Sequence, residues 1–325
     1  MLKIIVVSVI AIASVAAVDD LLLEDIAERV NAQKNTWTAT VYPRFANIED
    51  VKRMIDVRPN RYAHRDNMPK KPPTHMKLND MPKEFDVRDK WGHCSSIGQI
   101  RDQGDCAAGW AFAGANTMTD RLCINSGRVD ENVSEADLLT CCFECASGLG
   151  CEGGDLGLGF GFWENIGIVS GGEYGSNQGC IPYPLPPVGH ATIRPRPTPQ
   201  CQRKCREGYE KKYINDRTRA EEWEVYNSEL ELMTGLIAEG SIAVNMDVHS
   251  DFPTYRGGIY HHITDTVIGS HSARLIGWGE ENGIKFWRMA NSWGVNWGEN
   301  GFFRILRGSN ECGVESYAIS AKPRK

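Results

Sequence analysis

The chain has 325 residues, of which 41% are hydrophobic and 24% are charged, and its formal net charge is −6. This composition suffices for one large domain, or two closely packed ones, with a substantial core. The mild acidity argues against a nucleic-acid-binding protein, because such proteins gather Lys and Arg on one face.

Residues 1–17 have the pattern of a secretory signal peptide. Met1-Leu2-Lys3 is a short basic start, residues 4–17 are almost wholly apolar, and Ser14-Val15-Ala16 supplies small residues for cleavage. The apolar run is short for a bilayer, and no later run reaches the roughly 18 apolar residues of a membrane span. We therefore expect an exported protein without a membrane span.

Residues 18–80 contain no cysteine and show helical apolar spacing, at Leu22, Ile26 and Val30 and again at Val51, Met54 and Ile55. The Pro/Lys-rich stretch at residues 68–73 is expected to be extended, exposed and open to proteolysis. One interpretation is a helical subdomain with a linker. The other, favoured by the cleavable leader and the basic joint, is a pro-segment removed on maturation.

The composition then changes, and the next region predicts helices. The first helix has Gly127 as its stop and apolar residues three or four apart, at Trp110, Phe112, Ala115, Met118 and Leu122. The stretch Ser134-Glu135-Ala136-Asp137 predicts a capping box that opens a second helix. A short helical pattern covers residues 160–166. Seven prolines between 181 and 200 predict an exposed loop.

Eleven cysteines fit an oxidising compartment, and ten of them lie between positions 94 and 205. The odd number predicts five disulfides and one leftover thiol. A zinc cluster is the competing interpretation of Cys141-Cys142 and Cys145, but adjacent cysteines in an exported chain favour disulfides.

The C-terminal part has the alternating pattern of strands, at residues 241–248, 271–278, 285–290 and 301–307. Helices first and strands later predict an α+β protein in two lobes, one helical and one rich in sheet.

Several side chains supply parts of a thiol enzyme. A helix beginning near residue 107 could lower a thiol pKa, and Gln103 just before it could donate to an oxyanion. His271 opens an apolar strand, and Asn291 beside Trp293 could orient an imidazole.

With these residues in place, the chain resembles the papain-like cysteine peptidases, and within them cathepsin B. The matching stretches are RDQGDCAAGWAF, SEADLLTCC, CEGGDLG, GSHSARLIGWG, FWRMANSWGVNWGENGFFRILRG and ECGVES, from about residue 81 to the C-terminus. The resemblance implies a papain-like two-lobe fold, with a disulfide-rich helical lobe, a sheet or barrel lobe and a cleft between them. It also implies an extracellular or lysosomal location.

The resemblance assigns roles residue by residue. Gln103 matches the oxyanion-hole glutamine, His271 the imidazole partner and Asn291 the residue that orients it. Trp293 matches the shielding tryptophan, and Gly153 with Gly154 match the backbone that binds an extended peptide.

The same resemblance implies the domain limits and the disulfides. It divides the chain into a propeptide at residues 18–80 and a peptidase domain at residues 81–325. The implied pairs are Cys94–Cys123, Cys106–Cys151, Cys141–Cys201, Cys142–Cys145 and Cys180–Cys205, which leave Cys312 over.

The main departure from the family pattern is the missing nucleophile. The pattern C-G-[SA]-C-[WY] is here Cys106-Ala107-Ala108-Gly109-Trp110, so glycine stands at the nucleophile position. Losing a covalent nucleophile costs orders of magnitude in rate. Recruiting Cys106 instead would leave Cys151 unpaired and place the sulfur away from the attack geometry.

Two further departures concern specificity. The loop between Cys180 and Cys201 is shorter than the cathepsin B occluding loop and has only His190, so dipeptide release is not expected. Tyr317 takes the place of an acidic residue at the base of the S2 pocket, which favours apolar or aromatic side chains. Ser270 replaces a glycine and should narrow that pocket slightly.

The favoured hypothesis is a secreted or lysosomal pseudopeptidase that binds peptides, cystatin-type inhibitors or an active paralogue. The alternatives are an active cysteine endopeptidase with an unconventional nucleophile, Cys106 or Cys312, and a matrix protein on the same scaffold. We expect a monomer without a cofactor. We also expect no metal site, since the histidines show no metal-binding spacing and the adjacent His261 and His262 would point to opposite faces of a strand. Asn132 opens the only glycosylation sequon.

Overall fold

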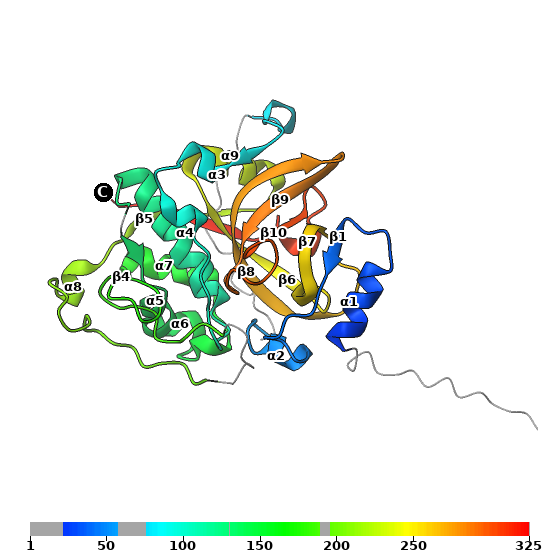
Figure 1. Ribbon diagram of the computed structural model, residues 1–325. Coiled ribbons are helices and arrows are strands. Elements are labelled where there is room, and N and C mark those ends of the chain that lie inside the picture. Colours follow the sequence, from blue (N-terminus) through cyan, green and yellow to red (C-terminus); the bar gives the residue numbers. More distant parts are fainter. Residues whose placement is uncertain (1–21, 58–75, 130, 189–195, 325) are drawn as a thin grey trace, which may run out of the picture.

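The computed structural model describes residues 22–57, 76–129, 131–188 and 196–324. The predicted signal peptide and the Pro/Lys-rich joint at 68–73 lie outside these residues. Figure 1 shows two lobes side by side, one built mainly of helices and one built around a sheet. This agrees with the predicted α+β class.

The helical lobe is formed by elements that lie between residues 87 and 216. Its helices and short strands are α3 (Val87–Lys90), α4 (Gly109–Ser126), β3 (Asn132–Val133), α5 (Glu135–Cys141), α6 (Phe143–Ala146), α7 (Leu156–Asn165), β4 (Ser170–Gly171) and α8 (Tyr213–Asp216). Strands β3 and β4 pair with each other.

The sheet lobe contains a nine-stranded sheet in the order β1-β7-β10-β9-β8-β6-β11-β5, with β2 paired to β8. Its elements are β2 (Phe85–Asp86), β5 (Ala220–Tyr226), α9 (Glu229–Glu239), β6 (Ile242–His249), β7 (Tyr255–Tyr260), β8 (Val267–Glu281), β9 (Ile284–Ala290), β10 (Phe302–Leu306) and β11 (Ala318–Pro323). The four predicted strands correspond to β6, β8, β9 and β10. The sequence patterns did not find α9, β5, β7 or β11.

Helix α4 is the central helix and begins at Gly109. It packs on α5 and α7 and against strands β8 and β11 of the other lobe. This double packing explains why nearly all of its first four turns are buried, from Gly109 to Cys123. Gly127 ends the helix in the left-handed conformation that glycine tolerates, as predicted.

Helix α5 begins as predicted, but its capping box is only half made. The Ser134 side chain accepts from the backbone N–H of Asp137, at 3.0 Å. The Asp137 carboxylate does not return the bond. It accepts from Tyr213 and from the N–H of Val169, because β4 and α8 pack onto this end of the helix.

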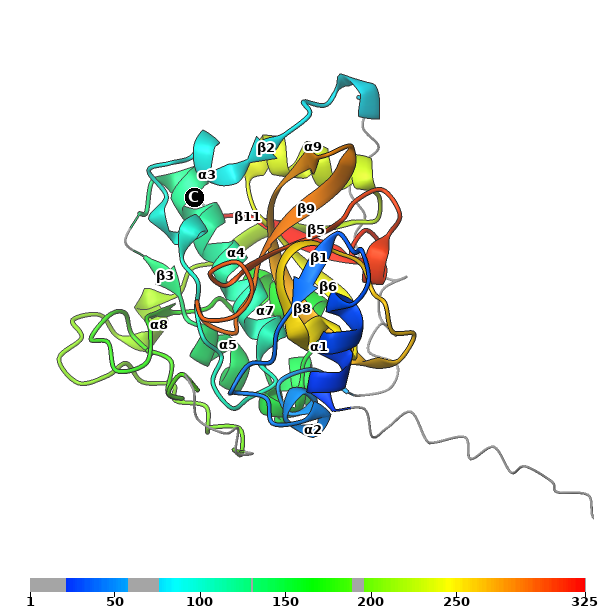
Figure 2. The ribbon, with the colours of Figure 1, turned by 45° about the vertical axis from the view of Figure 1, so that its right-hand side comes forward.

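The N-terminal segment 22–57 lies against both lobes and includes a strand that was not predicted. It contains α1 (Leu23–Asn31), β1 (Trp37–Ala39) and α2 (Ile48–Lys52). Strand β1 pairs antiparallel with β7 at the sheet edge. Figure 2 shows this blue segment lying over the sheet lobe, with α2 reaching the place where the lobes meet. A separate helical subdomain is therefore not what this segment forms.

The first part of the proline-rich stretch at residues 181–200 is buried, although the whole stretch was predicted to be an exposed loop. Tyr183, Leu185 and Val188 are buried, so the first part of the predicted exposed loop packs into the protein. Tyr183 also donates from its hydroxyl to the backbone carbonyl of Gln103. Apolar residues between the prolines provide this packing. The second part of the stretch includes residues 189–195, which lie outside the described ranges.

Five disulfides cross-link the helical lobe and its loops. They join Cys94–Cys123, Cys106–Cys151, Cys141–Cys201, Cys142–Cys145 and Cys180–Cys205. Cys312 is the remaining cysteine, and it is buried as a free thiol. Within the described part of the chain, no helix has both the length and the apolar character needed to cross a membrane.

Candidate functional site

The predicted site residues meet where the N-terminus of α4 faces strand β8. Gly109 is the first residue of α4, and His271 lies on β8 opposite Met246 of β6. A Cβ atom built on Gly109 would overlap the His271 ring, at Cε1 and Nδ1. The imidazole therefore occupies the space that a side chain at position 109 would need.

His271 is held on its other side by the residues expected to orient and shield it. Its Nε2 donates to Oδ1 of Asn291, at 2.8 Å, and its ring lies 5.0 Å from that of Trp293, centre to centre. All three side chains are buried. Nε2 carries the proton in this bond. The opposite edge of the ring, with Nδ1, faces Gly109.

Burial makes this imidazole a weak base. Loss of hydration lowers the pKa of His271 to about 4, and the hydrogen bond to Asn291 only partly opposes this. A neighbouring thiolate would favour the charged ring, but position 109 is glycine. The ring is therefore neutral at physiological pH.

Gln103 lies beside this pair and is fully buried. Its Oε1 accepts from the hydroxyl of Ser292, and its Nε2 donates to the carbonyls of Cys106 and Met54. Met54 belongs to the N-terminal segment. The side-chain amide that the resemblance reserves for a substrate is thus bonded to a carbonyl of the chain itself.

The N-terminal segment continues between the lobes past the predicted peptide-binding residues. Asp56 and Ser270 exchange two backbone hydrogen bonds of 2.8 Å. A Cβ on Gly153 would overlap the Asp56 carboxylate, whereas a Cβ on Gly154 would overlap the Trp110 ring. A cavity of only about 10 Å³ remains around Gly109 and His271.

A second set of contacts fixes the same segment to the loop that carries Trp293. Arg44 donates to the backbone carbonyl of Trp293 and pairs with Asp102, at 3.3 Å. Phe45 packs edge-on against the Trp293 ring, with 5.4 Å between centroids. These residues were not predicted, because nothing in their local pattern distinguishes them from ordinary core and surface positions.

The remaining predicted residues are all buried, and only Ser270 and Cys106 lie at this centre. Tyr317 is buried in the core beneath the helical lobe, and its carbonyl accepts from the N–H of Asn245. Ser270 lines the small residual cavity and is fully buried. Cys106 is tied to Cys151 next to Ala107, so its sulfur is not a thiol.

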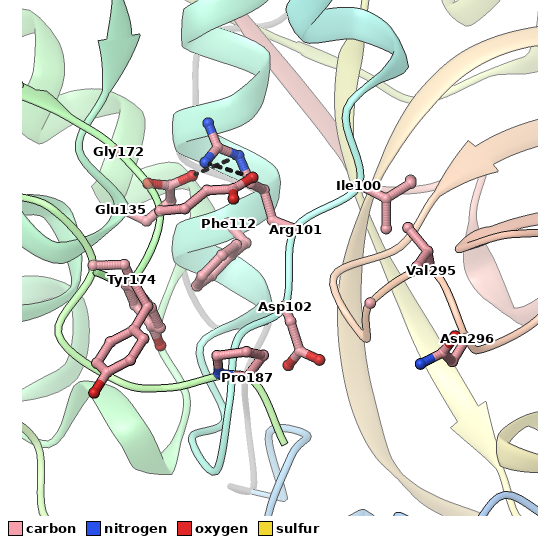
Figure 3. A pocket seen from close by; sticks show the side chains of 13 residues that line it. Ile100, Arg101, Asp102, Phe112, Glu135, Gly172, Tyr174, Pro187, Val295 and Asn296 are labelled. Carbon is pink, nitrogen blue, oxygen red and sulfur yellow. Dashed lines mark ion pairs between the residues drawn. The ribbon is translucent and has the colours of Figure 1, made fainter. Parts of the chain in front are cut away.

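A separate pocket of about 350 Å³ lies between the lobes (Figure 3). Ile100, Val295 and Asn296 line one side, and Phe112 and Tyr174 line the other. None of the predicted site residues lines it. The sequence did not predict this pocket, although seven of its residues lie inside the matched motifs, namely Arg101, Asp102, Phe112, Glu135, Gly294, Val295 and Asn296.

Charged side chains meet at one end of the pocket, where Arg101 and Glu135 are buried and Glu173 is exposed. Arg101 contacts Glu173 at 3.2 Å and Glu135 at 3.9 Å, as the dashed lines in Figure 3 indicate. Burial raises the pKa of Glu135, and the Arg101 guanidinium partly offsets this.

Possible metal ligands gather elsewhere. Among the described residues, two groups bring three ligand atoms within 4.8 Å of one another, namely His93 with Cys94 and Cys123, and His249 with His262 and Cys312. Neither group includes a residue of the His271 site. In the first group both sulfurs belong to one disulfide.

Comparisons with known proteins agree with this architecture. Residues 81–322 match the family described as papain family cysteine protease. A cathepsin B-like cysteine proteinase of Schistosoma japonicum is 39% identical over 297 residues, which cover 87% of this chain and 85% of the relative. Cathepsin B-like cysteine proteinase 6 of Caenorhabditis elegans is 38% identical over 318 residues, covering 93% and 83%.

A solved structure extends the match to the N-terminal segment. Procathepsin B S9 from Trypanosoma congolense superposes with a TM-score of 0.80 at 29% identity, covering 92% of this chain and 97% of that one. The matched family, the cathepsin B-like relatives and the two-lobe fold agree. The chain therefore belongs to the papain family of cysteine proteases, as a cathepsin B-like member.

Proposed function

We propose that this protein is a cathepsin B-like pseudopeptidase, which keeps the cleft of the family but does not hydrolyse peptides. The observation that carries the proposal is the His271 ring lying in the space beside Gly109. Glycine has no side chain to attack a carbonyl. The neutral ring, with its pKa lowered to about 4, has no thiol to deprotonate there.

The cysteines support the same proposal. Cys106 is bonded to Cys151, and a disulfide sulfur is not a nucleophile. Cys312 is a free thiol, but burial and the nearby Glu311 carboxylate raise its pKa. Reactive cysteines have the opposite surroundings, with partial exposure and positive neighbours. An active enzyme that uses either sulfur is therefore disfavoured.

We further propose that residues 18–80 are a propeptide that blocks the cleft of a peptidase-like domain at residues 81–325. Residues 54–56 bond to Gln103 and Ser270, and Arg44 and Phe45 hold the Trp293 loop. In this proposal the protein enters the secretory pathway and acts outside the cell or in the lysosome.

Once this segment is removed, the cleft binds an extended peptide or a cystatin-type inhibitor. The groups that would receive it are those that now bond to residues 54–56, namely the Gln103 amide and the Ser270 backbone. A binder of this kind could take up inhibitor or substrate that an active paralogue would otherwise meet. Peptides and inhibitors are thus the ligand classes we expect.

The test compares the full chain with protein matured by cleavage between residues 58 and 80. We expect neither form to cleave a dipeptidyl fluorogenic substrate or to be labelled by an epoxide thiol reagent. Cystatin should bind the matured form only, as measured by calorimetry.

An active cathepsin B, purified in the same way, serves as the positive control. Turnover by the matured form, with label found on Cys106 or Cys312 by peptide mass spectrometry, would overturn the pseudopeptidase. Absence of cystatin binding to a folded matured form would overturn the binding role alone.

A further inference from the structure

The guanidinium of Arg44 is held by two groups from beyond the N-terminal segment, the Asp102 carboxylate and the backbone carbonyl of Trp293. These two groups are here called the Arg44 subsite. Nη1 contacts Oδ2 of Asp102 at 3.4 Å, Nη2 contacts Oδ1 at 3.3 Å, and Nη1 also donates to the Trp293 carbonyl. Two nitrogens of one guanidinium thus face two oxygens of one carboxylate, which is a geometry that arginine can satisfy and lysine cannot.

The subsite is largely closed to water. The Arg44 side chain is 5% exposed and the Asp102 side chain 14%. Burial lowers the pKa of the Arg44 guanidinium, and the carboxylates of Asp102 and Asp105 oppose this. An exposed ion pair contributes little to binding, but a buried charge depends on its partner. The carboxylate is therefore what allows a guanidinium to be buried here.

Removal of the N-terminal segment would leave the Asp102 carboxylate without its cation. Oδ1 of Asp102 also accepts from the backbone N–H of Gly104, at 2.9 Å, which fixes the orientation of the carboxylate. Among the described residues, the ion pair with Arg44 is the only one that Asp102 makes. The vacated subsite would then be an oriented carboxylate beside a carbonyl oxygen, both ready to accept from a new donor.

The pocket of Figure 3 adjoins this subsite and gives a ligand side chain room to enter. Asp102, Gly294 and Asn296 line both that pocket and the cavity of about 100 Å³ around Arg44. Figure 3 shows the Asp102 carboxylate between Pro187 and Asn296. One carboxylate is thus shared between the place of Arg44 and an open pocket of about 350 Å³.

The charges around the pocket also suit a cationic ligand. The residues that line it include three carboxylates, those of Asp102, Glu135 and Glu173, and a single cationic side chain, that of Arg101. Arg101 is itself paired with Glu135 and Glu173. Asp102 is therefore the carboxylate that remains for the cation of a ligand.

We propose that the matured protein recognises an arginine side chain of its peptide or protein ligand through the Arg44 subsite. This rests on the proposed function, because the N-terminal segment must first leave the cleft. The guanidinium of the ligand takes the place of Arg44 on Asp102 and on the Trp293 carbonyl. Phe45 follows Arg44 and packs on the Trp293 ring, so ligands with an aromatic residue directly after the arginine fit best.

The first test uses the full chain and needs no maturation. Arg44→Ala empties the subsite, and we expect ethylguanidinium at millimolar concentration to raise the melting temperature of this variant. Ethylammonium should not, because only the planar guanidinium matches both carboxylate oxygens. Adding Asp102→Asn to Arg44→Ala should abolish the rise. Adding Asp89→Asn, at an exposed carboxylate of α3, is the matched control and should preserve it.

The second test measures which ligands the matured protein prefers. A synthetic peptide of residues 42–57 is compared by calorimetry with a version in which citrulline, the neutral isostere, replaces Arg44. We expect the arginine peptide to bind about thirtyfold more tightly, since the citrulline peptide leaves the Asp102 charge unpaired. The difference should disappear in matured Asp102→Asn. This comparison also stands if Arg44→Ala fails to fold, because the matured protein lacks residue 44.

The outcomes separate this inference from the proposed function. Equal effects of ethylguanidinium and ethylammonium on a folded Arg44→Ala variant, or equal affinities of the arginine and citrulline peptides, would overturn the arginine subsite. If cystatin still bound, the proposed binding role would stand without it. A folded matured protein that bound neither cystatin nor the arginine peptide would overturn both.

Discussion

Gly109 shows how one residue changes a site without disturbing its surroundings. His271 makes the expected hydrogen bond to Asn291, whereas the Gln103 amide donates to the carbonyls of Cys106 and Met54. The imidazole itself occupies the space that a side chain at position 109 would need. Restoring a side chain there must therefore displace the ring.

Two substitutions at position 109 distinguish the steric effect of an added side chain from the chemical effect of a thiol. Gly109→Ala adds a methyl group that overlaps His271, and we expect it to lower the free energy of unfolding by about 1 to 3 kcal/mol. Gly109→Cys has the same steric demand but supplies a thiol next to Nδ1. We expect the matured Cys variant to be labelled by an epoxide thiol reagent and to gain weak peptidase activity.

Mass spectrometry of the labelled peptide and urea unfolding measure the two effects. Labelling of the Ala variant would show that another cysteine reacts. An inert Cys variant would show that the cleft has lost more than its nucleophile.

The buried His271 also predicts a pH dependence of stability. Its pKa is about 4 when folded and near 6.5 when exposed, so the unfolded chain takes up the proton first as the pH falls. This group does not affect the free energy of unfolding above about pH 6.5, and it lowers that free energy as the pH falls, by about 3 kcal/mol in total at pH 4.

His271→Gln removes this titration. Urea unfolding of both proteins at pH 7 and pH 4 should show a smaller fall in stability for the variant. Equal falls would mean that the pKa of His271 is the same in the folded and the unfolded protein.

At the scale of elements, the N-terminal segment is held by pairing at a sheet edge as well as by the cleft. Strand β1 pairs with β7 across Gly257 and Gly258. Gly258 has φ of 99°, and a Cβ there would overlap the carbonyl of Thr36. Gly257 has room, since its Cβ would meet only the Glu299 side chain, at 3.5 Å.

This pair of glycines gives a matched test of the edge. We expect Gly258→Ala to detach β1, because the methyl group blocks its approach and strains the backbone. Hydrogen exchange at residues 37–39 should accelerate at least tenfold, and proteolysis within residues 22–57 should be faster. Gly257→Ala should leave both rates near those of the parent. Equal exchange rates in the two variants would contradict this account of the edge.

At the scale of the whole molecule, one buried ion pair joins the lobes. Arg274 of β8 bonds to Asp120 of α4, at 2.8 Å, and to the carbonyls of Ser96, Ile97 and Gln99. Asp120 also accepts from the hydroxyls of Ser96 and Ser241. Both side chains are buried and have neutral hydrogen-bond partners as well, but each is the opposite charge that neutralises the other.

Removing one charge should therefore destabilise the whole fold. We expect Asp120→Asn to lower the free energy of unfolding by about 3 to 5 kcal/mol, because it leaves a buried guanidinium unpaired. Glu49→Gln, at the exposed Lys52 pair, should change it by less than about 0.5 kcal/mol. Both values follow from urea unfolding with the disulfides intact. If both substitutions had similarly small effects, the contact between the two lobes would depend on packing alone.

The amino-acid sequence was sufficient to predict the fold class, the family, the central helix and four main strands. It could do so because helical and strand periodicity is local, and because Gly127 and Ser134 mark helix ends through their own backbone preferences. It also brought Gln103, His271 and Asn291 together through a resemblance that spans many unlinked motifs. The glycine at position 109 was likewise visible in the sequence.

The contacts in the cleft and the side-chain clusters outside it could not be predicted before the folded structure was known. Nothing local shows that Met54 bonds to Gln103, that His271 occupies the space beside Gly109, or that Tyr183 is buried among prolines. His249, His262 and Cys312 come together because β7 ends at Tyr260, one residue before His261. Such contacts join distant parts of the chain, and their energies depend on burial, which sequence periodicity does not specify.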